Sequence, residues 1–181
     1  MSEDDSITIE ATRASPPTCR VTYRHQELVL DCAAVRRLAE AMHAAAARAE
    51  AEAAAAGVFR ELQLGEEIVS GMLLGLRSRY EKHGFGIKGT LTFVPGVSVF
   101  DAAPFVHLNL LGGRAVRIDP AVLRGMAAQW LACAEAAERD VILLYALAEA
   151  TDLTPDQVEE VYRVMRNVRP TGLRDQEATD A

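Results

Sequence analysis

The sequence predicts one α+β domain, in which a mainly antiparallel sheet of about six strands packs against long, alanine-rich helices. Two patterns support this class. Apolar and polar residues alternate with the period of a half-buried strand over 19–31 and again over 86–118. Apolar residues recur at helical spacing through most of 32–83 and 120–168. A chain of 181 residues is long enough for one compact core and too short for two comfortable ones.

The two ends of the chain are polar. Residues 1–17 are acidic and close with Ser-Pro-Pro, and residues 170–181 have no apolar pattern. We therefore expect a flexible arm and a flexible tail around a single domain of residues 18–169. The acidic start is not followed by the apolar stretch of a secretory signal, and no uninterrupted apolar run approaches the length of a membrane span. The cytoplasm is the expected location.

The domain should begin with a β-hairpin over 19–31, whose two alternating strands flank a polar turn. Asp31 ends the hairpin, and its side chain is placed to cap a helix over 32–56. The second half of this helix is almost entirely alanine. Because alanine favours helix without demanding burial, we expect this half to project as a strut or to lie against a partner.

A second helix with a continuous apolar face is expected over 59–83. Gly65, Gly71 and Gly75 each lower its helix propensity by about 1 kcal/mol relative to alanine. A helix of this composition needs a packing reason, and we expect a neighbouring element to approach closely over the glycines. The alanine-rich helix before it is the expected neighbour, because small residues would then face small residues.

Four further strands are expected over 86–118, paired antiparallel because the links between them are short. Pro95-Gly96 is a turn dipeptide and should reverse the chain between the first two. Gly112-Gly113 suits a tight turn into the last strand.

The last strand and the helix after it echo the first pair. Residues 28–36 align with residues 116–124, and both segments contain an alternating strand, an aspartate and a helix with arginine at the same register. In this alignment Met42 falls opposite Trp130. The comparison predicts two ββα units that share one sheet with pseudo-twofold symmetry. The alternative is that any hairpin feeding a helix looks like this, because aspartate caps helices in many proteins.

A C-terminal αα-hairpin is expected from helices over 120–150 and 155–168. Thr154-Pro155-Asp156-Gln157 is a capping box with proline at the first helical position. Residues 147–168 resemble the helix-turn-helix motif of DNA-binding regulators, which implies a transcriptional regulator. Residues that match the packing positions of that motif are Leu147, Ala148, Leu153, Thr154, Val158 and Val161. The segment departs from the motif at Asp152, where glycine is usual.

Charge counts against DNA recognition by this hairpin. The helix that would read bases carries Glu159 and Glu160 among its polar positions, and the whole chain has a formal charge of −7. A structural or protein-binding hairpin is the main interpretation, and nucleic acid is not the expected partner. Arg163, Arg166 and Arg169 form an opposing basic patch, either a solvated helix end or an anchor for an acidic partner.

No pattern in the sequence predicts catalysis, a cofactor or a metal. The four histidines lack metal-type spacing. Cys19, Cys32 and Cys133 have no paired spacing, so buried, reduced thiols are expected. A Cys19–His107 pair across the sheet is conceivable, since the repeat alignment places these residues close to equivalent positions. A candidate pocket is centred near His107 and Trp130, between the sheet and the helices.

These observations favour a non-catalytic protein-interaction module: an adaptor, accessory or chaperone-like subunit that acts as a homodimer or within a complex. The acidic balance and the long alanine faces, which gain little from burial within one chain, are the main reasons. The alternative is a transcriptional regulator that uses residues 147–168. A third interpretation is a small enzyme or ligand-binding domain with its pocket near His107 and Trp130.

Overall fold

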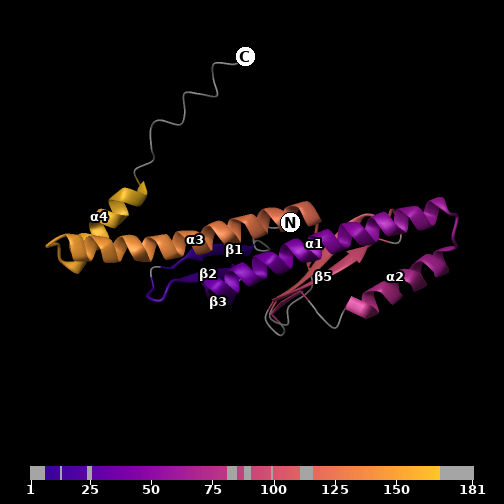
Figure 1. Ribbon diagram of the computed structural model, residues 1–181, viewed down its shortest axis with the longest axis horizontal. Coiled ribbons are helices and arrows are strands. Elements are labelled where there is room, and N and C mark those ends of the chain that lie inside the picture. Colours follow the sequence, from indigo (N-terminus) through magenta and orange to yellow (C-terminus); the bar gives the residue numbers. More distant parts are fainter. Residues whose placement is uncertain are drawn as a thin grey trace, which may run out of the picture.

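The computed structural model describes residues 7–12, 14–23, 26–80, 85–87, 91–98, 100–110 and 116–167. Within these ranges the chain forms four helices and seven strands (Figure 1). In chain order they are β1 (Ile7–Ala11), β2 (Thr18–Tyr23), β3 (Gln26–Asp31), α1 (Cys32–Glu61), α2 (Glu66–Tyr80), β4 (Phe85–Ile87), β5 (Leu91–Val97), β6 (Pro104–Leu110), β7 (Val116–Ile118), α3 (Pro120–Ala150) and α4 (Pro155–Asn167). The predicted α+β class is confirmed.

The strands form two separate antiparallel sheets, so the expectation of one sheet of about six strands is wrong. The first sheet has the order β1-β2-β3 and the second the order β4-β5-β6-β7. β1 lies inside the segment expected to be a flexible arm, and that prediction is wrong for residues 7–11. The physical reason is period-two alternation, since Ile7, Ile9 and Ala11 pack against the core while the strand pairs with β2.

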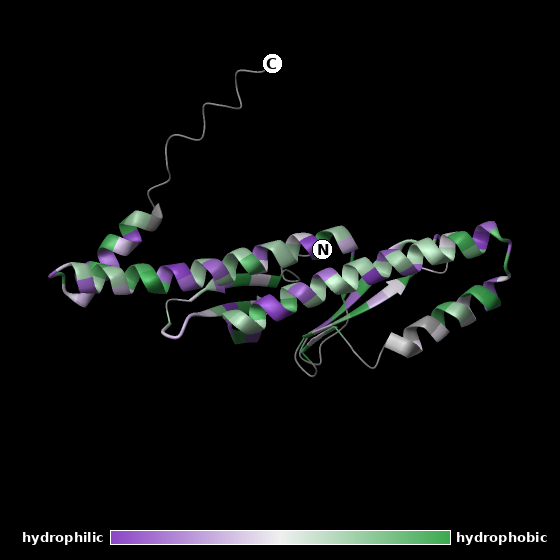
Figure 2. Ribbon diagram, in the orientation of Figure 1, coloured by the Kyte–Doolittle hydropathy of each residue, from purple (hydrophilic) through white to green (hydrophobic). Residues whose placement is uncertain are grey.

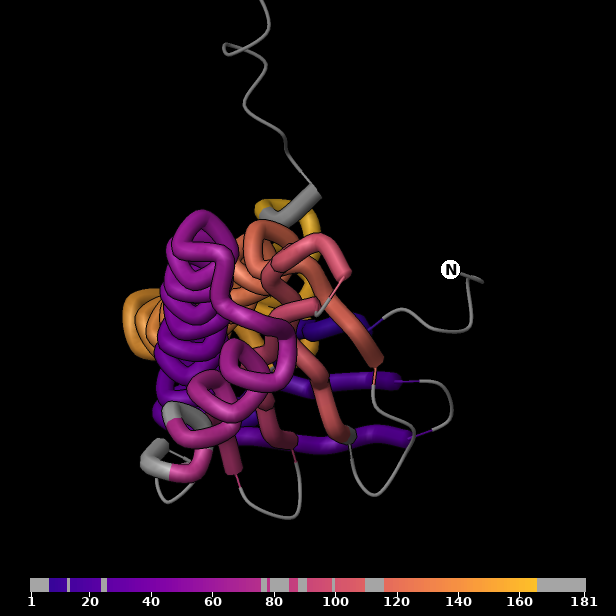
Figure 3. Tube along the Cα trace, turned by 90° about the vertical axis from the view of Figure 1, so that its right-hand side faces the viewer, coloured from indigo at the N-terminus to yellow at the C-terminus, as the bar shows by residue number. Residues whose placement is uncertain are grey.

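α1 and α3 lie side by side, and the two sheets lie against this helix pair (Figures 1 and 3). α1 is continuous with β3, yet it packs mainly on β4, β5 and β6 of the second sheet. α3 follows β7 and packs mainly on β1 and β2 of the first sheet. Each long helix therefore covers the sheet of the other half of the chain.

Two bidentate ion pairs join the long helices in a symmetric way. Arg36 of α1 donates through both terminal nitrogens to Glu138 of α3, at 2.6 Å each. Arg124 of α3 donates in the same way to Glu50 of α1. In each helix the arginine lies near the start and the glutamate near the middle, so the helices run antiparallel. The pairs also sit at matching positions after the capping residues Asp31 and Asp119.

Alanine lines the seam between these helices. Ala46 of α1 and Ala134 of α3 are fully buried, and each lies one turn before the glutamate that reaches across to the other helix. The alanine-rich half of α1 therefore packs within the chain and does not project as a strut. Its main neighbour is α3, while α2 packs Val69 and Leu73 against Ala53 and Ala56 at the end of α1. The expected pairing of the first two helices is therefore formed, but only at the end of α1.

α1 and α2 also differ from their predicted bounds. α1 continues to Glu61 and does not end at residue 56, and α2 begins at Glu66 and not at residue 59. A Cβ atom built at Gly65, Gly71 or Gly75 would meet nothing within 4 Å. The close approach expected over these glycines is therefore not made by any described part of this chain.

The predicted turn at Pro95-Gly96 is wrong, because β5 runs through both residues to Val97. The chain reverses after it, where the Ser98 amide donates to the Ala103 carbonyl at 2.9 Å. Among the described residues β4 pairs with residues 91–93 of β5, and Pro95 lies beyond the last of these pairs. Gly96 is required by a close approach, since a Cβ there would lie 2.5 Å from the Phe105 ring.

Candidate functional site

The structure does not bring His107 and Trp130 together. Along β6, Val106 and Leu108 are buried in the main core, and Trp130 belongs to the same core. His107 lies between them in sequence, so its side chain points to the opposite face of the sheet. There its ring meets the Phe105 ring edge-on at 4.9 Å between centroids. The predicted pocket between sheet and helices at these two residues is therefore wrong.

The Cys19–His107 pairing is also not formed, because Cys19 contacts other thiols. The Cys133 thiol donates to the Cys19 sulfur, with 3.7 Å between the two Sγ atoms. The strand registers explain the misplacement. Cys19 pairs with Leu30 in the first sheet and Val106 pairs with Ile118 in the second, so the proposed repeat would match Cys19 with Val106. His107 is the next residue along the strand, and its side chain therefore lies on the opposite face of the sheet.

The basic patch at the end of α4 is described only in part. Arg163 donates to both carboxylate oxygens of Glu160 at 2.6 Å, and this partner raises the pKa of the guanidinium above its usual value. The side chain of Arg166 and the whole of Arg169 lie outside the described residues. The proposed anchor for an acidic partner thus stays a prediction.

The αα-hairpin at 147–168 has the capping box expected from its sequence. The Gln157 side chain accepts from the Thr154 amide at 2.9 Å, and the Gln157 amide donates to the Thr154 hydroxyl at 3.4 Å. Val158 and Tyr162 are buried, and α4 packs on α3. Its exposed positions include acidic side chains at 156, 159 and 160. The surface that would face DNA in a helix-turn-helix protein is therefore acidic in its described part.

A candidate interaction surface that the sequence did not indicate lies on α2. The inner side of this helix packs Val69 and Leu73 against the end of α1 and β5. Its outer side leaves Ile68 at 51% and Met72 at 45% exposure. Apolar residues are visible on α2, and also on the end of α3 next to α4 (Figure 2). Burial of an apolar side chain is favourable, so an exposed apolar helix face is typical of a docking surface.

Glycines complete the outer side of α2. Residues 68, 71, 72 and 75 follow the i, i+3, i+4, i+7 spacing of one helix face, and two of them are Gly71 and Gly75. Space beside both glycines is open. We call the face formed by Ile68, Gly71, Met72 and Gly75 the α2 stripe. The stripe combines two exposed apolar side chains with two glycines. Because glycine has no side chain, the backbone of another helix can approach closely there.

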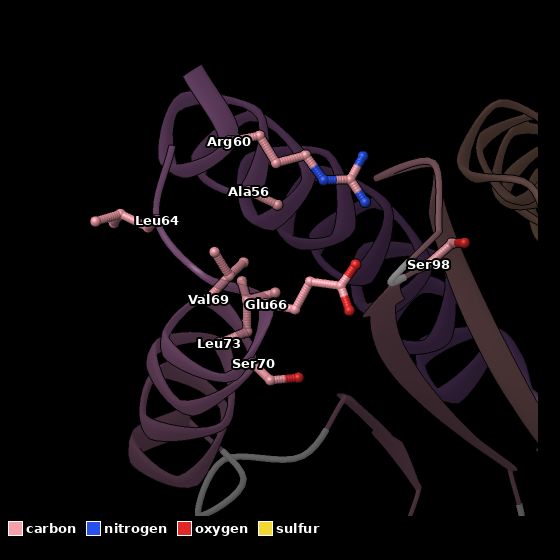
Figure 4. A pocket seen from close by; sticks show the side chains of 8 residues that line it. All are labelled: Ala56, Arg60, Leu64, Glu66, Val69, Ser70, Leu73 and Ser98. Carbon is pink, nitrogen blue, oxygen red and sulfur yellow. The ribbon is translucent and has the colours of Figure 1, made fainter. Parts of the chain in front are cut away.

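A recess of about 220 Å³ adjoins this helix, between α2, the end of α1 and the turn after β5 (Figure 4). Its lining residues are Ala56, Arg60, Leu64, Glu66, Val69, Ser70, Leu73 and Ser98. Arg60 and Glu66 extend from different helices toward the side where Ser98 lies (Figure 4). The recess is smaller than the roughly 300–1,000 Å³ typical of small-molecule sites, so a ligand-binding role is not favoured here.

The described residues contain no group of three or more His, Cys, Asp or Glu side chains arranged to hold a metal ion. Every helix among them is too short or too polar to span a lipid bilayer. Comparison of this chain with protein-family models, with curated proteins and with solved structures finds no match.

Proposed function

We propose that this chain is a non-catalytic protein-interaction module, of the adaptor, accessory or chaperone-like kind, that docks through the α2 stripe. The observation that carries the proposal is the contrast between the two sides of α2. Leu73 is buried against the rest of the chain, whereas Ile68 and Met72 on the outer side are exposed beside two open glycines. Such a face is suited to another helix, because glycine lets two helix backbones approach closely.

The occupant that best fits the α2 stripe is the α2 stripe of a second copy. α2 begins with Glu66 and Glu67, and the sequence has arginine at positions 77 and 79 near its end. In a dimer whose twofold axis is perpendicular to α2, the two copies of α2 would run antiparallel, so the acidic start of one would meet the basic end of the other. A self-complementary charge pattern of this kind favours a homodimer.

The dimer would leave the α4 hairpin free for a different protein. α4 lies at the opposite end of the molecule from α2 (Figure 1). Its exposed surface carries acidic side chains and the apolar residues Val164 and Met165. We propose that this end binds a second, different protein. An adaptor needs such a second binding surface if its other end is used for dimerisation.

We also propose that the module consists of two repeated units, each a three-stranded meander followed by a long helix. In this description β1-β2-β3-α1 corresponds to β5-β6-β7-α3, and β4 is an addition. The symmetric Arg–Glu pairs between the long helices support the correspondence. The unit is therefore larger by one strand than the ββα unit expected from the sequence.

The first prediction concerns the dimer. Sedimentation velocity of the full chain at micromolar concentration should show a dimer, and Met72→Glu should convert it to monomer by placing a charge in the α2 stripe. The matched control is Ile142→Glu, because Ile142 is 67% exposed on α3, outside the stripe. A wild-type monomer at tens of micromolar, or a dimer that only Ile142→Glu disrupts, would overturn the proposal.

The helix-turn-helix alternative requires a separate measurement. A regulator would bind duplex DNA at low salt, and Arg163→Glu would weaken that binding and reduce its salt dependence. The acidic exposed surface of α4 leads us to expect no binding. Saturable duplex binding that depends on Arg163 would favour the regulator instead.

A further inference from the structure

All three cysteines of the chain meet at one place. Cys19 lies in β2, Cys32 is the first residue of α1 and Cys133 lies in α3. The Sγ atoms of Cys133 and Cys19 are 3.7 Å apart, although the residues are separated by 114 positions. The Cys32 thiol donates to the Pro17 carbonyl at 3.5 Å, two residues before Cys19, and both cysteines are buried in the same core. The fold therefore assembles a thiol cluster that the sequence spacing does not reveal.

Packing alone does not require sulfur at these positions. The other half of the molecule has Val106 at the position of Cys19 and Ala45 at the position of Cys133. Both counterparts are buried apolar residues in the same core. Because valine and alanine fill the equivalent space there, the presence of two touching thiols in the first half points to a role that depends on sulfur chemistry.

The surroundings decide which thiol meets an oxidant first. Cys19 and Cys32 are buried, whereas Cys133 is half-buried. Burial, with Cys133 beside it, raises the pKa of the Cys19 thiol, and burial followed by the nearby Glu138 carboxylate raises the pKa of Cys32. A buried, protonated thiol reacts slowly with reagents from solvent. Cys133 is therefore the thiol that we expect to react first with an oxidant from solvent.

We propose that Cys19 and Cys133 form a disulfide site, at which a hydroperoxide creates a covalent bond between β2 and α3. The Cys133 sulfur attacks the terminal peroxide oxygen, and its proton leaves with the departing alkoxide as an alcohol, or as water from hydrogen peroxide. Cys133 is now a sulfenic acid. The Cys19 sulfur attacks the Cys133 sulfur, and the Cys19 proton leaves with the displaced hydroxide as water. Two thiols lose two electrons and two protons, and the peroxide bond is reduced.

The sulfur atoms start close to each other. They are 3.7 Å apart and must approach to about 2.05 Å for the bond to form. The bond would close a loop of more than a hundred residues, and long loops restrict the unfolded chain most strongly. It would hold the N-terminal sheet against the helix that covers it. The oxidised protein should therefore resist unfolding better than the reduced one.

The second prediction tests this site on the reduced, folded full chain treated with hydrogen peroxide. Intact mass should fall by the mass of two hydrogen atoms, and non-reducing peptide mapping should recover Cys19 linked to Cys133. The melting temperature should rise by on the order of 10 °C and return to its starting value with dithiothreitol. Cys32→Ser is the matched control and should give the same bond and the same shift.

Cys133→Ser should abolish both the mass change and the shift in melting temperature. Because Cys133 is only half-buried, we expect this variant to fold. Three results would overturn the proposal. One is a folded protein whose Cys133 proceeds to sulfinic acid without a disulfide. Another is a Cys19–Cys32 bond as the product. The last is a bond that forms only after urea has unfolded the chain.

Discussion

At the scale of single residues, the two Arg–Glu pairs make stability depend on pH in a defined direction. The guanidinium of Arg36 lowers the pKa of Glu138, and the guanidinium of Arg124 lowers the pKa of Glu50. A carboxyl whose pKa is lower in the folded than in the unfolded chain stabilises the fold above its unfolded pKa, about 4.3 for glutamate. This stabilisation is lost as the pH falls through the lowered, folded pKa.

The third prediction follows from this sign. Glu50→Gln and Glu138→Gln, alone and combined, should lower the urea midpoint at pH 7, because each leaves an arginine without its carboxylate. The difference from wild type should shrink as the pH falls below about 4.3, where the glutamates of the unfolded chain take up protons, and should vanish below the lowered pKa values of the folded wild type. Glu40→Gln, an exposed change on α1, should not alter the pH dependence. Parallel pH profiles for the double variant and wild type would contradict the assignment.

Residue-level prediction from the sequence worked where the partner is local. Asp31 caps α1 as predicted and accepts from the Ala34 amide at 2.6 Å. Asp119, the aspartate aligned with it, caps α3 and accepts from the Ala121 amide at 2.7 Å. The Arg36–Glu138 pair was missed, because its members are 102 residues apart and no local pattern connects them. The cysteine cluster was missed for the same reason.

At the scale of helices and strands, the seam between α1 and α3 depends on small side chains. Ala46 is fully buried there, whereas Ala47, the next residue, is exposed. The two alanines have the same helix propensity and differ only in what surrounds them. They therefore form a matched pair for measuring the tightness of the seam.

The fourth prediction uses this pair. Ala46→Leu should destabilise the protein by about 1–3 kcal/mol, because the added atoms have no space between the helices. Ala47→Leu should change stability by no more than about 0.5 kcal/mol. Urea unfolding followed by circular dichroism measures both. Equal effects of the two substitutions would show that the helices do not pack tightly at this point.

The positions of the helices were largely predictable, because helix propensity and capping depend on residues that are close together in the sequence. α3 and α4 begin and end within one residue of their predicted bounds. The sheets were less predictable. Alternation located most strands, but it does not encode which strands pair, so one sheet was expected where two exist. The exposure of the α2 stripe was also missed, since an apolar helical face looks the same whether it packs within the chain or against another molecule.

At the scale of the whole molecule, each long helix packs on the sheet formed by the other half of the chain. This arrangement joins the two halves into one folding unit. The first sheet is covered by α3 and the second by α1. Neither half can bury its apolar face without the helix supplied by the other, as a cooperative two-state domain requires.

The fifth prediction is a single unfolding transition for both halves. Native-state hydrogen exchange should give the buried strands β2 and β6 the same free energy of opening, and Leu123→Ala should lower both by the same amount, about 2–5 kcal/mol. Leu123 is fully buried near the start of α3. A substitution that lowers the protection of one sheet and leaves the other unchanged would show that the halves unfold independently.

The packing of each long helix on the sheet of the other half has a consequence for synthesis on the ribosome. β1, β2 and β3 are made first, but the helix that covers them begins only at Pro120. Until α3 has emerged, the apolar face of the first sheet lacks its main cover, and uncovered strands are prone to aggregate. The apolar face of the first sheet therefore stays exposed during much of the synthesis of the chain. Translation speed and holding factors would affect the yield of this protein more than its final stability suggests.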